Sequence, residues 1–240
     1  HVAVWEAPKR EDILSVDPSG RNTGNDRSLA FAPDSRLLAV TAEDGVQLWD
    51  LPARKLVSRL SRDAHPCHHV TVSRDGQYLA IGREKQGVVE VWRKSSDGWQ
   101  FAWEAKDQPS DHLAFSPSSA ALAVADWKGD EVAVYDVATG RVERRLPAQQ
   151  CWAAEFSPDG KQLAFTELDD VVLWDATQRQ VLRRLQEHRS TVRDLAYSPD
   201  GRRLASCSGD RRIGVWDAQR GPLLRTLMGH RTAVSQAAFV

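Results

Sequence analysis

Three residues towards the C-terminal end, His188, Ser206 and Asp210, are of the types that form a Ser-His-Asp catalytic triad. Such a triad also needs an exposed serine hydroxyl and an oxyanion hole, which many hydrolases supply through a Gly-x-Ser-x-Gly turn. The sequence contains no turn of that pattern. We therefore predict that the chain is not an enzyme and that it has no catalytic residues.

The densest group of metal-capable side chains is the segment His65-Pro66-Cys67-His68-His69. A zinc site needs three or four such ligands that converge on one point. Cys67 and His68 are expected at the start of a strand, where neighbouring side chains point to opposite faces of the sheet. We therefore predict no bound metal and no cofactor, and we interpret the segment as a loop contact.

The charges of the chain nearly balance, with 32 Lys and Arg against 33 Asp and Glu and a net charge of -1. This balance excludes a nucleic-acid binder driven by overall charge and an acidic solvating tail. No apolar run approaches the roughly 20 residues of a membrane helix, and no signal peptide is visible. Cys67, Cys151 and Cys207 are too far apart and odd in number for a disulfide framework. We expect a cytoplasmic location and no membrane partner.

The elements that must position these residues repeat along the chain. A turn of the Ser-Pro-Asp-Gly type follows a residue of similar character at Phe31, Val72, Phe115, Phe156 and Tyr197. These positions are 41, 43, 41 and 41 residues apart. A second marker is an aromatic residue at the end of a run that alternates polar and apolar residues. It recurs with a similar period, at Trp5, Trp49, Trp92, Tyr135, Trp174 and Trp216. Two independent markers that share one period predict a repeat protein.

Each unit alternates polar and apolar residues with a period of two, which is typical of strands. In the last complete unit, four strands are expected at residues 192–197, 203–207, 213–216 and 223–227. Tight turns join them into an antiparallel sheet. Because one such sheet cannot bury both of its faces alone, the sheets must stack radially.

The pairs Trp49-Asp50, Trp174-Asp175 and Trp216-Asp217, together with Gly229-His230 and the period near 42, resemble the WD40 repeat family over essentially the whole chain. The motif Ser-Pro-Asp-Gly-x-x-Leu-Ala also occurs in TolB-like propeller repeats, but the Trp-Asp and Gly-His pairs favour WD40. The resemblance implies an all-β fold, a β-propeller of four-stranded blades that serves as a rigid interaction platform.

In the WD40 pattern the triad-like residues match a structural tetrad, here His188, Ser206, Asp210 and Trp216. The resemblance implies a hydrogen-bond chain from the Trp N–H through the Ser hydroxyl and the His ring to the Asp, which ties strands together. The other units depart from this pattern, with Val40 and Ile81 at the serine position, Tyr135 in place of Trp, and Asp170 in a shortened turn. For those blades we expect apolar packing instead.

The repeat divides the chain into five complete units and two partial ones. The complete units span about residues 25–64, 65–108, 109–148, 149–187 and 188–229, and the partial units span 1–24 and 230–240. The first partial unit holds a third and a fourth strand, and the last holds one more first strand at Thr232–Val240. If the ring closes, Trp5 and this last strand belong to one composite blade that lacks its second strand.

Two architectures fit this count. One is a six-bladed ring with a three-stranded closing blade, and the other is an arc of a propeller of seven or more blades. Because the chain begins at His1, inside an alternating segment, we favour a piece of a longer polypeptide.

The first strand is the innermost strand of a propeller blade, so the start of each first strand should line the mouth of the central channel. The matching positions, which we call the strand-start face, are Arg27, His68, Asp111, Trp152, Arg193 and Ser235. They vary and are mostly polar, whereas core positions would be uniformly apolar. We predict that this face binds a protein or peptide partner with Trp152 as the anchor. The alternative is that Trp152 covers the loop of the adjacent blade.

Eight arginines gather on the expected fourth strands, at the outer edge of the blades. They are Arg54, Arg59, Arg141, Arg144, Arg145, Arg183, Arg184 and Arg225. They protect the edges against strand addition, or they form a basic rim for nucleic acid or acidic partners. Because Glu143 and Glu187 dilute the rim and no aromatic residues are interleaved for base stacking, we do not expect nucleic-acid binding.

The leading functional hypothesis is a non-catalytic interaction scaffold that holds a protein or peptide on the strand-start face. The alternative is a regulatory or sensor portion of a larger signalling enzyme, such as a kinase or NTPase fused upstream. A less favoured third is an enzyme or small-ligand site at the channel mouth. It would need converging carboxylates or histidines, and His68 with Asp111 is too little.

Overall fold

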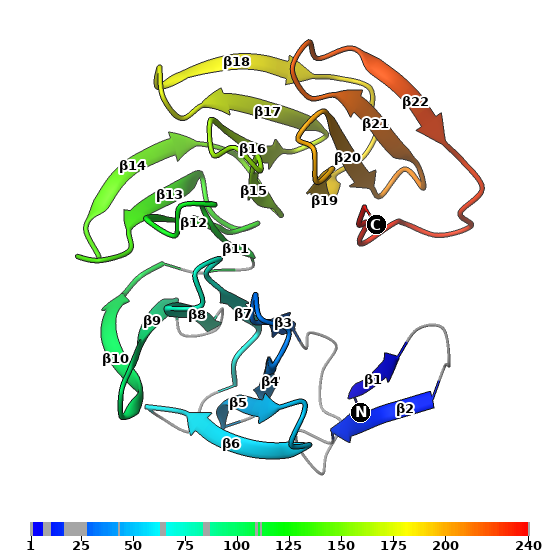
Figure 1. Cartoon of the computed structure of the whole chain (residues 1–240). Coiled ribbons are helices and arrows are strands. Elements are labelled where there is room, and N and C mark those ends of the chain that lie inside the picture. Colours follow the sequence, from blue (N-terminus) through cyan, green and yellow to red (C-terminus); the bar gives the residue numbers. More distant parts are fainter. Residues whose placement is uncertain are drawn as a thin grey trace. The chain divides into compact units, whose positions relative to one another are not determined.

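The computed structural model describes residues 2–6, 11–16, 28–42, 44–62, 66–83, 87–108, 110 and 112–239, with the backbone alone for 2–6 and 11–16. The described residues form strands β1 to β22 and no helix, so the all-β prediction is confirmed. In this part of the chain no helix is long and apolar enough to cross a membrane. The chain divides into two compact units, His1–Gln108 and Pro109–Val240 (Figure 1).

The first unit contains one two-stranded and two four-stranded antiparallel sheets. The two-stranded sheet pairs β1 (Val2–Glu6) with β2 (Glu11–Val16). The next sheet consists of β3 (Leu29–Phe31), β4 (Leu37–Ala42), β5 (Gly45–Asp50) and β6 (Lys55–Leu60). The third consists of β7 (His69–Val72), β8 (Tyr78–Arg83), β9 (Val88–Ser95) and β10 (Gly98–Ala105). Strands that follow one another in sequence pair within each sheet, as expected for blades.

The second unit contains three four-stranded antiparallel sheets. The first consists of β11 (His112–Phe115), β12 (Ala121–Ala125), β13 (Glu131–Asp136) and β14 (Val142–Pro147). The second consists of β15 (Ala154–Phe156), β16 (Gln162–Glu167), β17 (Asp170–Asp175) and β18 (Gln180–Leu185). The third consists of β19 (Val192–Tyr197), β20 (Arg203–Ser208), β21 (Ile213–Asp217) and β22 (Leu223–Leu227). Within this unit β15 contacts both β11 and β19, while β14, β18 and β22 are the outer strands (Figure 1).

The core lies between neighbouring sheets and is built mainly from their middle strands. Four consecutive residues of β16 are buried, whereas five of the six residues of β18 are exposed. One cluster joins the first two sheets of the second unit and includes Ala123, Val134, Leu163 and Trp174. Both faces of a middle strand are therefore covered by adjacent sheets, which is the reason that a single unit of the repeat cannot fold alone.

The Ser-Pro-Asp-Gly turns place one residue in the left-handed backbone region in every four-stranded sheet. The residues are Ser35, Gly76, Ser119, Gly160 and Gly201, with φ of 55°, 68°, 60°, 72° and 68°. The positive φ expected at Gly201 is thus confirmed, and serine adopts it where glycine is missing. Where the motif is complete the serine also closes the turn, as Ser157 Oγ does by donating to Asp159 Oδ1 at 2.7 Å.

The C-terminal segment differs from expectation, because the described residues 232–239 form no strand. The segment still lies beside β19 and β20. The Val234 N–H donates to the Ser208 carbonyl at 3.1 Å, and the Ala237 N–H donates to Asp194 Oδ2 at 3.0 Å. One backbone bond and one side-chain bond do not make a ladder, which is what a strand requires. The pairing of this segment with residues 1–6 in a closing blade stays a prediction.

Candidate functional site

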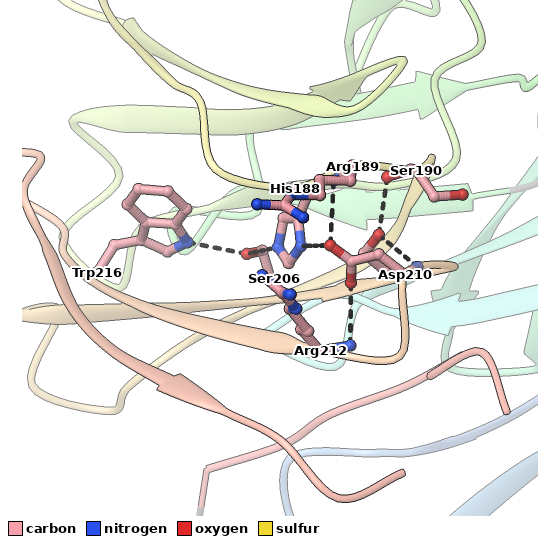
Figure 2. Close-up of polar contacts among 8 residues, drawn as sticks. His188, Arg189, Ser190, Ser206, Asp210, Arg212 and Trp216 are labelled. Carbon is pink, nitrogen blue, oxygen red and sulfur yellow. Dashed lines mark hydrogen bonds and ion pairs between the residues drawn. The ribbon is translucent and has the colours of Figure 1, made fainter. Parts of the chain in front are cut away.

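The side chains of His188, Ser206, Asp210 and Trp216 form one continuous chain of hydrogen bonds (Figure 2). The Trp216 Nε1–H donates to Ser206 Oγ at 2.8 Å. Ser206 Oγ lies 2.7 Å from His188 Nε2, and His188 Nδ1 lies 3.1 Å from Asp210 Oδ2. Because Asp210 accepts from Nδ1, the neutral ring leaves Nε2 to accept the serine proton. Each of the three side-chain donors in this chain of hydrogen bonds then has an acceptor.

Asp210 is also held by the backbone around it. The Arg189 N–H donates to Asp210 Oδ2 at 3.1 Å, and the Arg212 N–H donates to Asp210 Oδ1 at 2.9 Å. Burial by itself would raise the pKa of this carboxyl, but the Arg189 N–H, the His188 ring and the Arg212 N–H together hold the pKa below its usual value. The carboxylate therefore stays charged and fixes both the loop before β19 and the turn after β20.

This arrangement is unsuited to nucleophilic catalysis. Ser206 has no exposed surface, and its Oγ is engaged by both Trp216 and His188. A substrate therefore cannot reach the serine in this conformation. The geometry fits a device that satisfies buried polar groups and ties a loop to two strands.

Gly214 makes room for this chain of hydrogen bonds. A Cβ atom at that position would lie 2.8 Å from Trp216 Nε1 and 2.9 Å from Ser206 Oγ. Real Cβ atoms do not approach other atoms so closely, so the indole or the serine would have to move. The absence of a side chain two residues before the tryptophan is therefore part of the tetrad.

Two other sheets fill that same position and satisfy their tryptophan differently. The Trp49 Nε1–H donates to Gln47 Oε1 at 3.2 Å, and the Trp92 Nε1–H donates to Glu90 Oε2 at 3.2 Å. Glu90 also accepts from Arg83 Nε at 3.1 Å, and the two side chains are only 2% and 1% exposed. These two blades do lack the tetrad and share an apolar cluster, but the expectation of apolar packing left out the side-chain acceptor that each tryptophan N–H has. In each of them the acceptor comes from the strand of the tryptophan itself and replaces the serine of the neighbouring strand.

The structure describes four of the six residues of the strand-start face. Arg27 and Asp111 lie outside the described residues. His68 belongs to the first unit and is half-buried, whereas Trp152, Arg193 and Ser235 belong to the second. Trp152 is half-buried, and Arg193 and Ser235 are exposed.

The histidine- and cysteine-rich segment before β7 shows no metal site in its described part. His65 lies outside the described residues, and Cys67 is buried. Among the residues that are described, no three His, Cys, Asp or Glu side chains gather as metal ligands would.

Trp152 lies against Trp127, a residue that the sequence analysis did not single out. The two indole rings are stacked, with centroids 5.2 Å apart and planes inclined by 16°. The Arg193 guanidinium lies over the Trp152 ring at 5.9 Å from its centroid, and the Lys128 ammonium lies over the Trp127 ring at 5.0 Å. We call these four residues the tryptophan patch.

The strand registers explain why the patch forms. His112 at the start of β11 pairs with Ala125 at the end of β12, so the turn that holds Trp127 lies at the same edge as the starts of the inner strands. The Trp152 N–H donates to Thr166 Oγ1 at 2.9 Å, which fixes the backbone just before β15. In the last complete unit the matching turn holds Gly209-Asp210. The aromatic residue at this place in the turn is the sequence signal that could have revealed Trp127.

Three of the outer-strand arginines are paired with acidic residues of neighbouring segments. The ion pairs are Arg59 with Asp44, Arg145 with Glu131, and Arg184 with Glu167. Because all these arginines are about half exposed, the pairs contribute little to stability but reduce the positive charge of the rim.

Comparison with known proteins relates these sheets to a family. The family described as WD domain, G-beta repeat, matches residues 179–217, the segment that contains the tetrad. The chain is 29% identical to periodic tryptophan protein 2 of Saccharomyces cerevisiae over 81% of its length, covering 26% of that protein. It is 28% identical to SEC12-like protein 2 of Arabidopsis thaliana over 80% of its length, covering 51% of that protein.

A further relative is apoptotic protease-activating factor 1 of Rattus norvegicus, 26% identical over 73% of this chain and covering 14% of that protein. The chain thus spans about a quarter, a half and a seventh of these three relatives. Residues 179–217 match a WD40 repeat, and the repeated four-stranded antiparallel sheets, the hydrogen-bonded tetrad and these similarities make the chain similar to WD40-repeat β-propeller proteins.

Proposed function

We propose that this chain is a non-catalytic scaffold for protein–protein or protein–peptide interaction, with its partner bound on the strand-start face around Trp152. The observation that carries the proposal is the stacked pair of half-buried tryptophans, Trp127 and Trp152, with exposed cations beside it. Half-exposed indoles with a polar rim are typical anchors of interfaces, where tryptophan and arginine dominate the binding energy.

The alternative, in which Trp152 merely covers the adjacent blade, accounts for less. Covering a neighbouring loop would bury the Trp152 ring and would not require cations above the rings. The patch instead leaves two large aromatic side chains partly exposed to water. The fold thereby forgoes the free energy that full burial of their apolar surface would contribute. A partner that covers this surface would remove that cost.

The proposal is tested by comparing the wild type with Trp152→Ala and with Phe101→Ala. Phe101 is a matched control, because it is an exposed aromatic residue on β10 with the Arg62 guanidinium 4.0 Å from its ring centroid. Partners recovered by the wild type are identified, purified and titrated against each variant by calorimetry.

We expect Trp152→Ala to weaken binding by roughly thirtyfold or more, about 2 kcal/mol, and Phe101→Ala to leave it unchanged. Thermal unfolding shows whether each variant is folded. Equal affinities of the wild type and a folded Trp152→Ala protein for every partner would place the site elsewhere.

A second candidate function is a regulatory portion of a larger signalling enzyme. It is favoured by the fraction of each relative that the chain covers, and one of these relatives is named as a protease-activating factor. The gene should then encode a kinase or NTPase domain upstream of this chain. Its activity should change when residues 1–240 are removed, and an unchanged activity would contradict this function.

A further inference from the structure

We propose that the Asp97-Gly98 step, at the tip of the hairpin between β9 and β10, is a modification site at which aspartate converts spontaneously to isoaspartate. In this reaction the Gly98 nitrogen attacks the Asp97 side-chain carboxyl carbon and forms a C–N bond. The amide proton and the carboxyl hydroxyl leave together as water. Water then opens the cyclic imide, and opening at the α-carbonyl leaves the main chain running through the side chain of residue 97. This chemistry does not depend on the proposed scaffold function.

The chain contains five Asp-Gly steps, the dipeptide in which this ring closes most readily because glycine has no side chain to hinder it. They are Asp44-Gly45, Asp75-Gly76, Asp97-Gly98, Asp159-Gly160 and Asp200-Gly201. The reaction requires the aspartate side chain and the next backbone nitrogen to rotate towards each other. The folded structure therefore decides which of the five steps reacts.

Three of these aspartates are held by the turn in which they lie. In each, the serine two residues earlier donates its hydroxyl to Oδ1, and the backbone N–H two residues later donates to the same oxygen. The two distances are 2.6 and 2.9 Å at Asp75, 2.7 and 3.0 Å at Asp159, and 2.6 and 3.0 Å at Asp200. The serine hydroxyl and the N–H hold the pKa of Asp159 and of Asp200 below its usual value. These carboxyls stay ionised and so lack the hydroxyl that must leave.

The other four glycines are also packed against neighbouring atoms. A Cβ atom at Gly45 would lie 2.3 Å from the Leu60 carbonyl oxygen, and the preceding Asp44 is paired with Arg59 at 3.1 Å. For the remaining three, a Cβ atom would lie near a proline ring of another turn, at 3.7 Å for Gly76, 3.6 Å for Gly160 and 3.5 Å for Gly201. A backbone packed in this way cannot rotate to close the ring unless the neighbour moves.

The Asp97-Gly98 step has neither restraint. Ser95 occupies the place of the holding serine, but its Oγ donates to the Gly98 carbonyl at 2.9 Å instead. Among the described residues, the Asp97 carboxylate accepts a hydrogen bond only from the adjacent Ser96 Oγ, at 3.3 Å. Asp97 and Gly98 are both exposed, and apart from the chain neighbours no atom lies within 4 Å of a Cβ placed at Gly98. An exposed loop tip of this kind opens readily.

The modification would alter the hairpin itself. Isoaspartate lengthens the main chain by one atom between Ser95 and Gly98, the first pair of the β9–β10 register. The next pair, Lys94 with Trp99, depends on the same alignment, and Trp99 packs against the apolar cluster of the first two four-stranded sheets. We therefore expect the modified hairpin to lose protection against amide hydrogen exchange at its tip.

Peptide mapping of the aged full chain tests this inference. The protein is incubated at neutral pH below its unfolding temperature, and a parallel sample is incubated in concentrated urea. Isoaspartyl peptides keep their mass but change their chromatographic retention, and methyl transfer from S-adenosylmethionine by a protein isoaspartyl methyltransferase measures their amount. One variant is Asp97→Glu, whose longer side chain cannot close the five-membered ring. The other is Ser157→Ala, which removes the hydroxyl that holds Asp159.

In the folded wild type we expect Asp97 to convert roughly tenfold faster than each of the other four aspartates, which corresponds to about 1.4 kcal/mol of activation free energy. In urea the five rates should become similar. Asp97→Glu should remove most of the methyl acceptance, and a folded Ser157→Ala protein should convert faster at Asp159 alone.

Two results would overturn the proposal. One is conversion at Asp97 that is no faster than at the other four aspartates of the folded protein. The other is a preference for Asp97 that persists unchanged in urea, because the neighbouring sequence and not the fold would then set the rate. An unchanged rate at Asp159 in folded Ser157→Ala would show that the serine hydroxyl does not protect these turns.

Discussion

In three of the four-stranded sheets, a single residue decides how the indole N–H of the third-strand tryptophan is satisfied. Gly214 leaves space for Ser206 and so for the full tetrad, whereas Gln47 and Glu90 at the matching position accept the indole proton themselves. An indole N–H that is shielded from water needs an acceptor. One position on the third strand therefore selects between two hydrogen-bond networks that serve the same purpose.

Removal of the Asp210 carboxylate should destabilise the fold. In Asp210→Ala the His188 ring and the N–H groups of Arg189 and Arg212 lose their acceptor. We expect a loss of about 1–3 kcal/mol in the free energy of unfolding, measured by denaturant titration. Asp97→Ala, at an exposed hairpin, serves as the control and should change little. An unchanged midpoint for Asp210→Ala would mean that the tetrad contributes no stability.

The buried ion pair of the second four-stranded sheet should be more sensitive still. In Glu90→Gln the amide can still accept from Trp92, but Arg83 loses its charged partner where water does not reach. We expect a loss of about 3 kcal/mol or more, because removing one charge of a buried ion pair is strongly destabilising. Glu131→Gln, which breaks the more exposed pair with Arg145, should cost less than about 1 kcal/mol. Similar midpoints for both variants in denaturant would refute this distinction.

Side chains in or next to inner strands accept hydrogen bonds from backbone N–H groups roughly 42 residues further along the chain. These bonds link neighbouring elements. Ser28 Oγ accepts from the Val70 N–H in the first unit. In the second, Glu155 Oε2 accepts from the Tyr197 N–H, and Asp194 Oδ2 accepts from the Ala237 N–H. The residue types differ from sheet to sheet, so the sequence shows no motif for these links. Only the packing of one inner strand against the next makes them visible.

Two of these links make stability depend on pH. Burial raises the pKa of Glu155 to about 8 and that of Asp194 to about 6, each above its value in the unfolded chain. The folded state therefore holds protons that the unfolded state has lost, and stability falls as the pH rises from about 4 towards 8.

The substitution Glu155→Gln isolates one of these groups. An amide accepts the Tyr197 N–H but does not titrate, so the fall in stability between pH 6 and 8 should flatten, by up to about 1.4 kcal/mol for each pH unit. Urea unfolding at several pH values measures this, with the exposed Glu143→Gln as the control. A pH profile that Glu155→Gln leaves unchanged would show that Glu155 is already ionised in the folded state.

Local sequence patterns predicted the strands and turns, whereas contacts between neighbouring sheets decided the features that the sequence did not predict. The strands and turns around Ser157 and Gly160 follow from alternation and turn chemistry, which act over a few residues. Trp127 was missed because its role depends on Trp152 in the next sheet. The segment 232–239 was expected as a strand from its register, but a strand also needs a partner to pair with.

Across the whole molecule, similar sheets are held by different internal networks. The family match covers residues 179–217, where the tetrad lies, while the first two four-stranded sheets use Gln47 and Glu90. Each four-stranded sheet shares its core with a neighbour within its unit, so hydrophobic burial is a common contribution to these five sheets. Differences in stability between sheets should then follow the polar networks.

We therefore expect the sheet of β19 to β22 to be the most protected against amide hydrogen exchange. Its tetrad joins the loop at His188 to β20 and β21, and Ser208 Oγ adds a bond of 2.7 Å to the Ser190 carbonyl. Such links raise the free energy of local opening, which exchange measures directly. Mass spectrometry of peptides from all five four-stranded sheets should show the slowest exchange at residues 192–217. In Asp210→Ala the protection should fall there, while β15 to β18 keep most of theirs. Equal protection of all five sheets in the wild type would show that the shared apolar core, and not the tetrad, sets the local stability.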